Sequence, residues 1–378
     1  MTALRWRRSR VSYVTLWMVL ILSFCIVAFL GHGLLPNETG SYPASSPLAR
    51  EATATELSLP NSNLYSNGKP SLYPRKATQQ DNAQSRVWLI LNTIILPNTP
   101  LYLPYYLTHY QQLGLDFRYS YIIVIATEEL EGERKEIYQQ MVNILDQYGA
   151  YHELFTNLTG ENHDFISRLT SNRGVREQDW VLHTDVDELH EWMTGYKIVE
   201  EGGEVKQRRQ TVPEFLLETV DKTDFTHVVG HFMDRVAADG TLLPILPWTE
   251  GGASLWQQFP LGCQVTKVVT RGTVQKVLAF RGSYKVNNGQ HTLMLKESVV
   301  ECCQTTAWPE VMTVHHFKFI KGVPEVLKER RKKNKYNFSA VYKAENKRML
   351  QHFWDHADKI CVGCPELECK HLGGPPSY

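Results

Sequence analysis

The chain has 378 residues, of which 43% are hydrophobic, and carries 40 basic and 40 acidic side chains. This length and apolar content are typical of a globular protein with one large domain or two ordinary ones. Four arginines at positions 5, 7, 8 and 10 precede the first acidic residue, so the remainder has 36 basic and 40 acidic side chains and a net charge of −4. A nucleic-acid partner is therefore not expected.

An uncharged apolar segment follows the arginines over residues 11–30. Twenty residues of helix are long enough to cross the hydrocarbon core of a membrane. No further arginine or lysine occurs before Arg50, so the positive-inside rule places residues 1–10 in the cytosol as a short tail and the rest of the chain in the lumen. The alternative is a cleaved secretory signal. The longer run favours a type II signal anchor, and both interpretations make the body lumenal.

Two further features agree with a lumenal body. Asn37, Asn157 and Asn337 each begin an N-glycosylation sequon. Six cysteines follow the apolar segment and are compatible with three disulfides, with the pairing open among 15 possibilities. The C-terminal C-V-G-C-P-E-L-E-C could instead bind zinc, although in an oxidising lumen a disulfide is the favoured interpretation. These six cysteines are Cys263, Cys302, Cys303, Cys361, Cys364 and Cys369.

Composition divides the lumenal part into three segments. Residues 31–86 are rich in Pro, Ser, Asn and Thr and have no hydrophobic period, so a disordered stem is expected. A folded domain is predicted over residues 87–340, where apolar runs begin abruptly. Residues 341–378 form a C-terminal extension that contains cysteines.

The first half of the domain alternates strand and helix patterns. Continuous apolar runs predict buried strands, and apolar residues at spacings of three and four predict helices that end at Gly114 and Gly149. This alternation favours a mostly parallel, Rossmann-like α/β sheet covered by helices on both faces. The predicted elements are a strand at 87–96, a helix at 103–113, a strand at 119–126, a helix at 137–148 and a strand at 180–184.

The second half is less regular. Pro213 predicts the start of a short helix because proline is favoured in the first turn, and residues 226–235 form another apolar strand pattern. Residues 248–300 mix glycine, short β-branched runs and basic residues, which indicates strands and loops. The strongly basic residues 325–335 are interpreted as a solvated helix face, with a phosphate or anionic-acceptor site as the alternative.

Two carboxylates, Asp185 and Asp187, come at the end of the apolar run before them. Residues two apart on a strand point to the same side, and ligands of parallel sheets gather at the carboxyl ends of strands. The pair therefore predicts a seat for Mn²⁺ or Mg²⁺ holding a diphosphate, with Asp187 binding the metal and Asp185 completing the site or binding ribose. Surface residues at a strand end are the alternative. Further possible ligands nearby are His183, Glu188, His190 and Glu191.

The segment W-V-L-H-T-D-V-D-E-L-H-E-W resembles the D-x-D block of membrane-anchored GT-A type glycosyltransferases, particularly those grouped with families 2 and 92. Upstream, L-P-Y-Y-L-T-H-Y-Q-Q-L-G-L-D resembles the helix after their first strand. Downstream, G-H-F-M-D-R-V-A-A-D-G-T-L, S-L-W-Q-Q-F-P, K-V-L-A-F-R-G and V-H-H-F-K-F-I-K-G-V resemble their remaining blocks. The likeness spans roughly residues 87–331 in order and spacing.

The resemblance implies a GT-A fold, a nucleotide-sugar donor such as a UDP-sugar, and a divalent metal, commonly Mn²⁺. It also implies a third metal ligand from a C-terminal histidine, and His315 and His316 are the positions that fit. The alternative is that these two histidines form a core or interface pair. His291 is a competing candidate for the third ligand. Many relatives have Asn-Glu after the first strand, whereas Asn92 is followed here by Thr93, so the resemblance does not extend to donor recognition at that edge.

An inverting transfer needs a carboxylate that takes the acceptor proton. Asp234 is the first candidate base and Glu250 the second, although Asp234 could equally pair with Arg235 or act as a structural cap. Arg235, Lys276 and Arg281 are candidate contacts for the diphosphate or the acceptor, or ordinary salt-bridge residues.

The sequence thus predicts a single-pass type II Golgi glycosyltransferase that moves a sugar to a glycan or glycoprotein. Two alternatives are a lumenal metal-dependent hydrolase using the same carboxylates and a non-catalytic, membrane-tethered binding protein on a transferase scaffold. Turnover that requires an acceptor would distinguish a transferase from the hydrolase. Failure to bind Mn²⁺ with a nucleotide would favour the non-catalytic binding protein.

Overall fold

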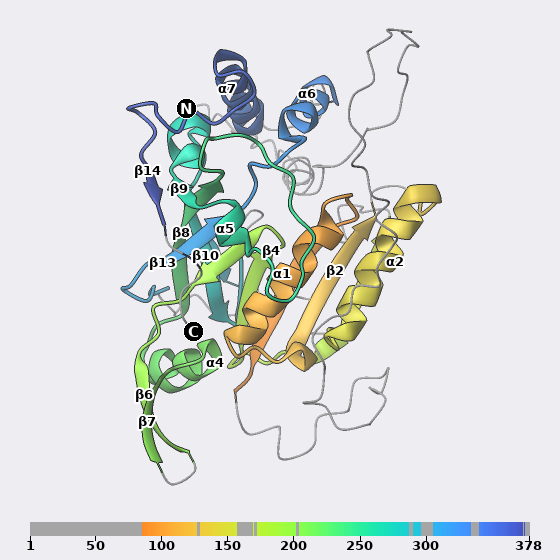
Figure 1. The fold of residues 1–378 in the computed structure, drawn as a ribbon. Helices are drawn as coiled ribbons and strands as arrows, with labels where there is room; N and C mark the ends of the chain where they lie inside the picture. Colours follow the sequence, from red (N-terminus) through yellow and green to blue (C-terminus); the bar gives the residue numbers. More distant parts are fainter. Residues whose placement is uncertain are drawn as a thin grey trace, which may run out of the picture.

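The fold is organised around one large mixed sheet (Figure 1). The computed structural model describes residues 85–126, 129–156, 169, 172–201, 204–286, 290–295, 305–333, 340–372 and 374. Within them the sheet has ten strands, in the order β14-β9-β8-β10-β4-β1-β2-β3, and β13 and β5 extend it from β8. The strands are β1 (Val87–Ile94), β2 (Ser120–Ala126), β3 (His152–Thr156), β4 (Trp180–Asp185), β5 (Glu188–Glu191), β8 (His227–Val236), β9 (Leu261–Cys263), β10 (Gln275–Arg281), β13 (Met312–His316) and β14 (Cys369–His371).

Helices and two small hairpins complete the described part. The helices are α1 (Thr99–Gln112), α2 (Gly132–Gln147), α4 (Val212–Glu214), α5 (Leu255–Gln258), α6 (Val323–Lys333) and α7 (Ala340–Asp355), with shorter turns η4 (Phe117–Tyr119), η6 (Phe215–Thr219), η7 (Val220–Lys222) and η8 (Thr266–Thr270). The hairpins are β6 (Tyr196–Glu201) with β7 (Glu204–Arg209), and β11 (Tyr284–Val286) with β12 (Leu293–Leu295). The β6–β7 hairpin extends away from the main sheet (Figure 1).

The first half of the sheet is parallel, as the strand and helix alternation predicted. Strands β3, β2, β1 and β4 lie side by side and run in the same direction. All residues of β2 and β4 are buried, which explains their continuous apolar sequences. The expected helices are α1 and α2, and both end before a glycine with positive φ, at Gly114 (85°) and Gly149 (63°). The predicted Rossmann-like α/β class is confirmed.

Different segments of the chain cover the two faces of the parallel strands. Helices α1 and α2 lie together on one face, where Leu103 and Leu107 of α1 are completely buried (Figure 1). On the other face, in the part of the chain that the structure describes, the packing comes from Val175 and Leu169 and from Tyr284 of the β11–β12 hairpin. Leu169 is itself helical, and most of the segment around it lies outside the described residues.

The second half of the sheet mixes directions. Strand β10 lies antiparallel between β4 and β8, and β13 runs parallel to β8 and antiparallel to β5.

The strand predicted at 226–235 is β8, and the helix predicted at Pro213 is the short α4, whose Thr211 and Glu214 form a reciprocal capping box. The basic stretch 325–335 begins within α6. β13, which carries His315 and His316, was not predicted as a strand.

The segment expected as a C-terminal extension packs onto the domain. Met349 and Phe353 of α7 are buried, and β14 adds an antiparallel strand beside β9. Two disulfides occur among the described cysteines, Cys263–Cys369 and Cys361–Cys364. The second disulfide uses both sulfurs of the C-x-x-C pair, so the structure supports the disulfide interpretation of this motif over zinc.

We expect the two disulfides to contribute unequally to stability. Cys263–Cys369 closes a loop with a sequence separation of 106, whereas Cys361–Cys364 spans 3. Loop-closure entropy of the unfolded chain grows with loop length, so serine at both cysteines of the first pair should lower the free energy of unfolding by about 3 kcal/mol more than serine at both cysteines of the second. Chemical denaturation of the two double variants measures the difference. Equal losses would contradict the assignment of Cys263–Cys369 as the dominant cross-link.

Several sequence expectations fall outside the described residues. They concern the cytosolic tail 1–10, the apolar segment 11–30, the stem up to residue 84, the sequons at Asn37, Asn157 and Asn337, and the adjacent Cys302 and Cys303. Across the residues that the structure does describe, no helix is both long and apolar enough for a membrane span.

Candidate functional site

The two aspartates lie at the carboxyl end of β4, where ligands of α/β sheets gather. Asp185 is the last residue of the strand, but Asp187 lies in the two-residue turn to β5. The expectation that both occupy one side of a strand tip is therefore corrected: the turn, and not strand alternation, presents Asp187. The Asp187 side chain is 27% exposed, compared with 13% for Asp185, so Asp187 is the more accessible of the two carboxylates.

Pairing of β13 with β5 brings His316 to Asp187. In this antiparallel pair His316 lies opposite Glu188, the residue after Asp187. His316 Nε2 is 3.7 Å from Asp187 Oδ2, which is longer than a hydrogen bond. One potential ligand atom from each of Asp187, Glu188 and His316 lies within 4.8 Å of the others. Carboxylate and imidazole ligands of this kind suit Mn²⁺, so the residues fit the metal that the sequence predicted.

Asp234 lies behind His316. The Nδ1–H group of His316 donates to Asp234 Oδ1 at 2.9 Å, and Asp234 also accepts hydrogen bonds from the Thr266 amide (2.6 Å) and hydroxyl (2.8 Å). A proton on Nδ1 leaves the Nε2 lone pair facing Asp187. The Asp234 side chain is about 1% exposed. Asp234 is thus placed as a buried carboxylate that orients the His316 ring, a different position from that of the solvent-facing base predicted from the sequence.

Lys276 is buried between two carboxylates. Its ammonium is 2.7 Å from Asp185 Oδ2 and 2.5 and 2.6 Å from the two oxygens of Glu188, and its side chain has no exposed surface. The expected contact of Lys276 with a diphosphate is therefore replaced by a structural ion cluster under the D-x-D turn. This cation holds β10, β4 and β5 together at the site.

The charges in this cluster shift one another's pKa values. Burial would raise the pKa of Asp185, but the adjacent Lys276 outweighs it and lowers that pKa. Burial raises the pKa of Glu188 to about 7 despite Lys276, and the Asp185 charge acts in the same direction. Burial alone would lower the pKa of Lys276, but Asp185 and Glu188 together outweigh burial and raise that pKa. Lys276 therefore remains charged at neutral pH.

Unpartnered polar atoms lie at the end of β1, next to Asp185. Asn92 lies directly opposite Asp185 in the β1–β4 register, and its Nδ2 donates to His183 Nε2 at 2.9 Å. Asn92 Oδ1, Thr93 Oγ1 and His183 Nδ1 are buried without a hydrogen-bond partner in the described part of the chain. Buried polar groups normally have partners, so this edge is suited to a polar ligand. The site places Asn92 where the sequence expected donor binding.

The remaining predicted residues lie elsewhere. His315 points to the opposite face of β13 from His316, and its Nε2 is 3.0 Å from a carboxylate oxygen of Glu191. Arg235 likewise points to the opposite face of β8 from Asp234. His291 hydrogen-bonds the Gln275 carbonyl oxygen, and Arg281 pairs with Asp221. Glu250 is exposed in the loop between β8 and α5. Only His316 of the three candidate histidines joins the carboxylate cluster.

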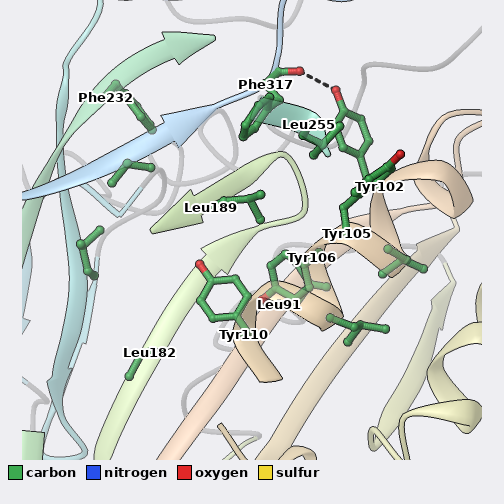
Figure 2. Packing of buried hydrophobic residues seen from close by; sticks show 14 of the residues in the cluster. Leu91, Tyr102, Tyr105, Tyr106, Tyr110, Leu182, Leu189, Phe232, Leu255 and Phe317 are labelled. Carbon is green, nitrogen blue, oxygen red and sulfur yellow. Dashed lines mark hydrogen bonds between the residues drawn. The ribbon is translucent and has the colours of Figure 1, made fainter. Parts of the chain in front are cut away.

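Tyrosines of helix α1 pack against the strands that carry the site (Figure 2). The Tyr102 hydroxyl donates to the Phe317 carbonyl oxygen at 2.5 Å, and the Tyr110 hydroxyl donates to the Glu188 carbonyl oxygen at 3.3 Å. The Tyr106 and Thr184 hydroxyls share a hydrogen bond at 2.5 Å. These tyrosines bond a side chain of β4 and the backbone of β5 and of the segment after β13, so they position the turn that carries Asp187.

Sequence reasoning missed Thr266 and the pairing of Asp234 with His316. Thr266 lies at the start of η8, within the region interpreted only as mixed strand and loop, and no motif marks it. His316 was one of three candidates. The parallel pairing of β13 with β8, which places His316 opposite Asp234, is the information that selects it.

No family model and no curated protein matches the chain. Among solved structures, that of S. aureus TarS is similar, with a TM-score of 0.28 and 9% sequence identity, and the match covers 71% of this chain and 43% of that chain. The structure of S. aureus TarS 1-349 has a TM-score of 0.26 and 9% identity, and the match covers 71% and 72% of the two chains. The chain thus spans less than half of the longer TarS structure. Scores of this size do not establish a shared fold, so the site residues are the basis for inferring function.

Proposed function

We propose that this protein is a metal-dependent glycosyltransferase that moves a sugar from a nucleotide diphosphate to a hydroxyl of a glycan or glycoprotein. The observation that carries the proposal is the set Asp187, Glu188 and His316, with Asp234 orienting His316, at the carboxyl end of a parallel strand. Mn²⁺ or Mg²⁺ held by these residues would supply Lewis-acid stabilisation of the departing diphosphate. The GT-A resemblance of the sequence leads to the same proposal.

The chain's own residues divide the work of the proposed reaction. Asp187 and His316 would hold the cation, while Asp234, itself held by Thr266, orients the His316 ring. Lys276 offsets part of the negative charge of Asp185 and Glu188, and Asp187 keeps a carboxylate for the cation. The unpartnered polar atoms of Asn92 and His183 are available to a nucleotide at the edge of the sheet. Glu250 remains the candidate base.

We further propose that the protein works in the lumen of the secretory pathway, in the Golgi, anchored by residues 11–30. The support is the charge asymmetry around that segment together with two disulfides in the folded part, because disulfides persist in oxidising compartments.

The direct test is a screen of the full-length protein against UDP-sugars and other nucleotide sugars, with and without Mn²⁺ and with candidate acceptors. Mn²⁺-dependent nucleotide release that requires an acceptor supports the transferase. Release at the same rate without an acceptor would support the hydrolase alternative instead. Absence of any Mn²⁺-induced or nucleotide-induced rise in thermal stability would favour a non-catalytic binding protein.

Replacement of Asp234 by asparagine should weaken Mn²⁺ binding by about 10- to 100-fold, because removal of a carboxylate that orients a ligating histidine typically has this effect. The measurement is Mn²⁺ affinity by isothermal titration calorimetry. Glu250→Gln serves as the control, since this exposed residue should leave Mn²⁺ affinity unchanged and affect turnover only. Full turnover with unchanged Mn²⁺ affinity in Asp234→Asn would contradict the orienting role.

A further inference from the structure

A second polar pocket lies on the opposite face of the strands that carry the candidate metal site. It encloses about 280 Å³ and is lined by Glu191, Arg235, Trp256, His315, His371, Leu372 and Gly374. Arg235 follows Asp234 in β8, and His315 precedes His316 in β13. Because neighbouring residues of a strand point to opposite faces, the two sites lie back to back across the sheet.

Three buried side chains in this pocket lack partners for one polar atom each. These atoms are Arg235 Nη1, Trp256 Nε1 and His315 Nδ1, which have no hydrogen bond in the described part of the chain. The exposed fractions of the three residues are 0%, 6% and 3%, respectively. Arginine and the indole nitrogen can only donate hydrogen bonds. Arg235 and Trp256 therefore each present a donor that a ligand with acceptor oxygens would satisfy, whereas His315, whose Nε2–H group donates to Glu191, presents Nδ1 as an acceptor.

The charge of Arg235 points to an anion. Its Nε donates to the Phe259 carbonyl oxygen at 2.9 Å and its Nη2 to the Trp256 carbonyl oxygen at 3.3 Å, but no carboxylate lies within ion-pair distance among the described residues. A buried cation without a counter-charge is costly. Burial accordingly lowers the pKa of Arg235 to about 10, with partial compensation from Glu191.

The other titratable groups that line the pocket form no ion pair with Arg235 among the described residues. The Glu191 side chain is 36% exposed and accepts a hydrogen bond from His315 Nε2 at 3.0 Å, so its direct partner is His315 and not Arg235. His371 is exposed on β14. The wall formed by His371 and Leu372 is fixed by β9–β14 pairing and by the Cys263–Cys369 disulfide, so the pocket is built by the fold.

We propose that this pocket binds an anionic group, a carboxylate, sulfate or phosphate, through the donors of Arg235 and Trp256. The proposal does not depend on the transferase activity, because its residues are distinct from those of the metal site. The pocket volume is at the lower end of the range for small-molecule sites, which suits a free oxyanion or an acidic monosaccharide.

The experiment is a thermal-shift titration of the full-length protein with sodium phosphate, sodium sulfate and sodium glucuronate, with glucose and sodium chloride at matched ionic strength as references. A ligand that binds the native state raises its stability. We expect shifts with the oxyanions and none with glucose or chloride. Response to phosphate and sulfate alone identifies a free inorganic anion, and a response to glucuronate identifies a carboxylate-bearing sugar.

Variants locate the binding to this pocket. Arg235→Met keeps the side-chain length without the charge and should weaken oxyanion binding by about 10- to 100-fold, the effect of a lost charge-assisted hydrogen bond. Trp256→Phe should weaken it less, and Glu191→Gln should strengthen it by removing a negative charge. If the oxyanions act no differently from chloride, or if Arg235→Met and Trp256→Phe both respond as the unmodified protein does, the proposal is overturned.

Discussion

Replacing Asp187 with alanine is expected to reduce Mn²⁺ affinity by at least about 100-fold and to bring Mn²⁺-dependent nucleotide release to background. Asp187 is the most accessible carboxylate of the cluster and faces His316 Nε2, so it would be a direct ligand. Loss of a direct ligand should cost at least as much as the 10- to 100-fold that loss of an orienting partner costs. Calorimetric titration with Mn²⁺ and a nucleotide-release assay measure the two effects.

The same substitution should leave the fold intact. Asp187 lies in a turn, is 27% exposed, and makes no ion pair shorter than 3.7 Å among the described residues. We therefore expect the free energy of unfolding to change by less than about 1 kcal/mol. Asp224→Ala, which removes an exposed aspartate outside the site, is the matched control and should keep full Mn²⁺ affinity. A folded Asp187→Ala protein that binds Mn²⁺ normally would remove the proposed metal site.

Replacing Lys276 with methionine should lower the free energy of unfolding by about 3–5 kcal/mol, the usual cost of removing one partner of a buried ion pair. Methionine nearly fills the volume of the lysine stem, so the loss would come from charge and not from a cavity. The variant leaves Asp185 and Glu188 close together without the cation that contacts both. Chemical denaturation at about pH 8 measures this loss.

The deficit of Lys276→Met should shrink as the pH falls. Burial and the Asp185 charge already raise the pKa of Glu188 to about 7, and loss of Lys276 would raise it further. A carboxyl group whose folded-state pKa exceeds its unfolded value gains a proton on folding, so the free energy of unfolding falls as the pH rises through the unfolded and then the folded pKa. Denaturation at about pH 5.5 should therefore show a smaller deficit than at about pH 8.

A second substitution identifies the cause of that deficit. Glu188→Gln in the Lys276→Met background removes one of the two uncompensated charges and should recover a large part of the lost stability at pH 8. Glu191→Gln in the same background is the control, because Glu191 points to the opposite face and contacts His315. A deficit that does not vary with pH and is not relieved by Glu188→Gln would show that Lys276 stabilises the site by packing alone.

The sequence identified the carboxylate pair and its strand because both depend on local patterns. Continuous apolar residues marked β4, and the helical spacing of Leu103, Tyr106 and Tyr110 marked α1, which is buried at these positions. A local pattern could not distinguish the strand-end position of Asp185 from the turn position of Asp187. The two-residue turn between β4 and β5 depends on pairing of β5 with β13, about 125 residues along the chain.

The roles of the distant residues could not be read from composition or spacing. Asp234 and Lys276 were each plausible as a base or a diphosphate contact, since an isolated charge in a sequence does not reveal its burial. In the structure Asp234 accepts hydrogen bonds from His316 and Thr266, and Lys276 forms ion pairs with two carboxylates. Buried charges need partners, and those partners come from other strands of the sheet.

The sequence by itself determined the Rossmann-like α/β class, the parallel order of the first strands and helices, and the position of the D-x-D residues at a strand end. Those features follow from hydrophobic period and helix-ending glycines, which act over a few residues. Tertiary structure decided which histidine joins the carboxylates, which charges are neutralised internally, and that Arg235 and His315 face a separate pocket. These outcomes depend on strand register and on the alternation of side chains across the sheet, which only long-range pairing fixes.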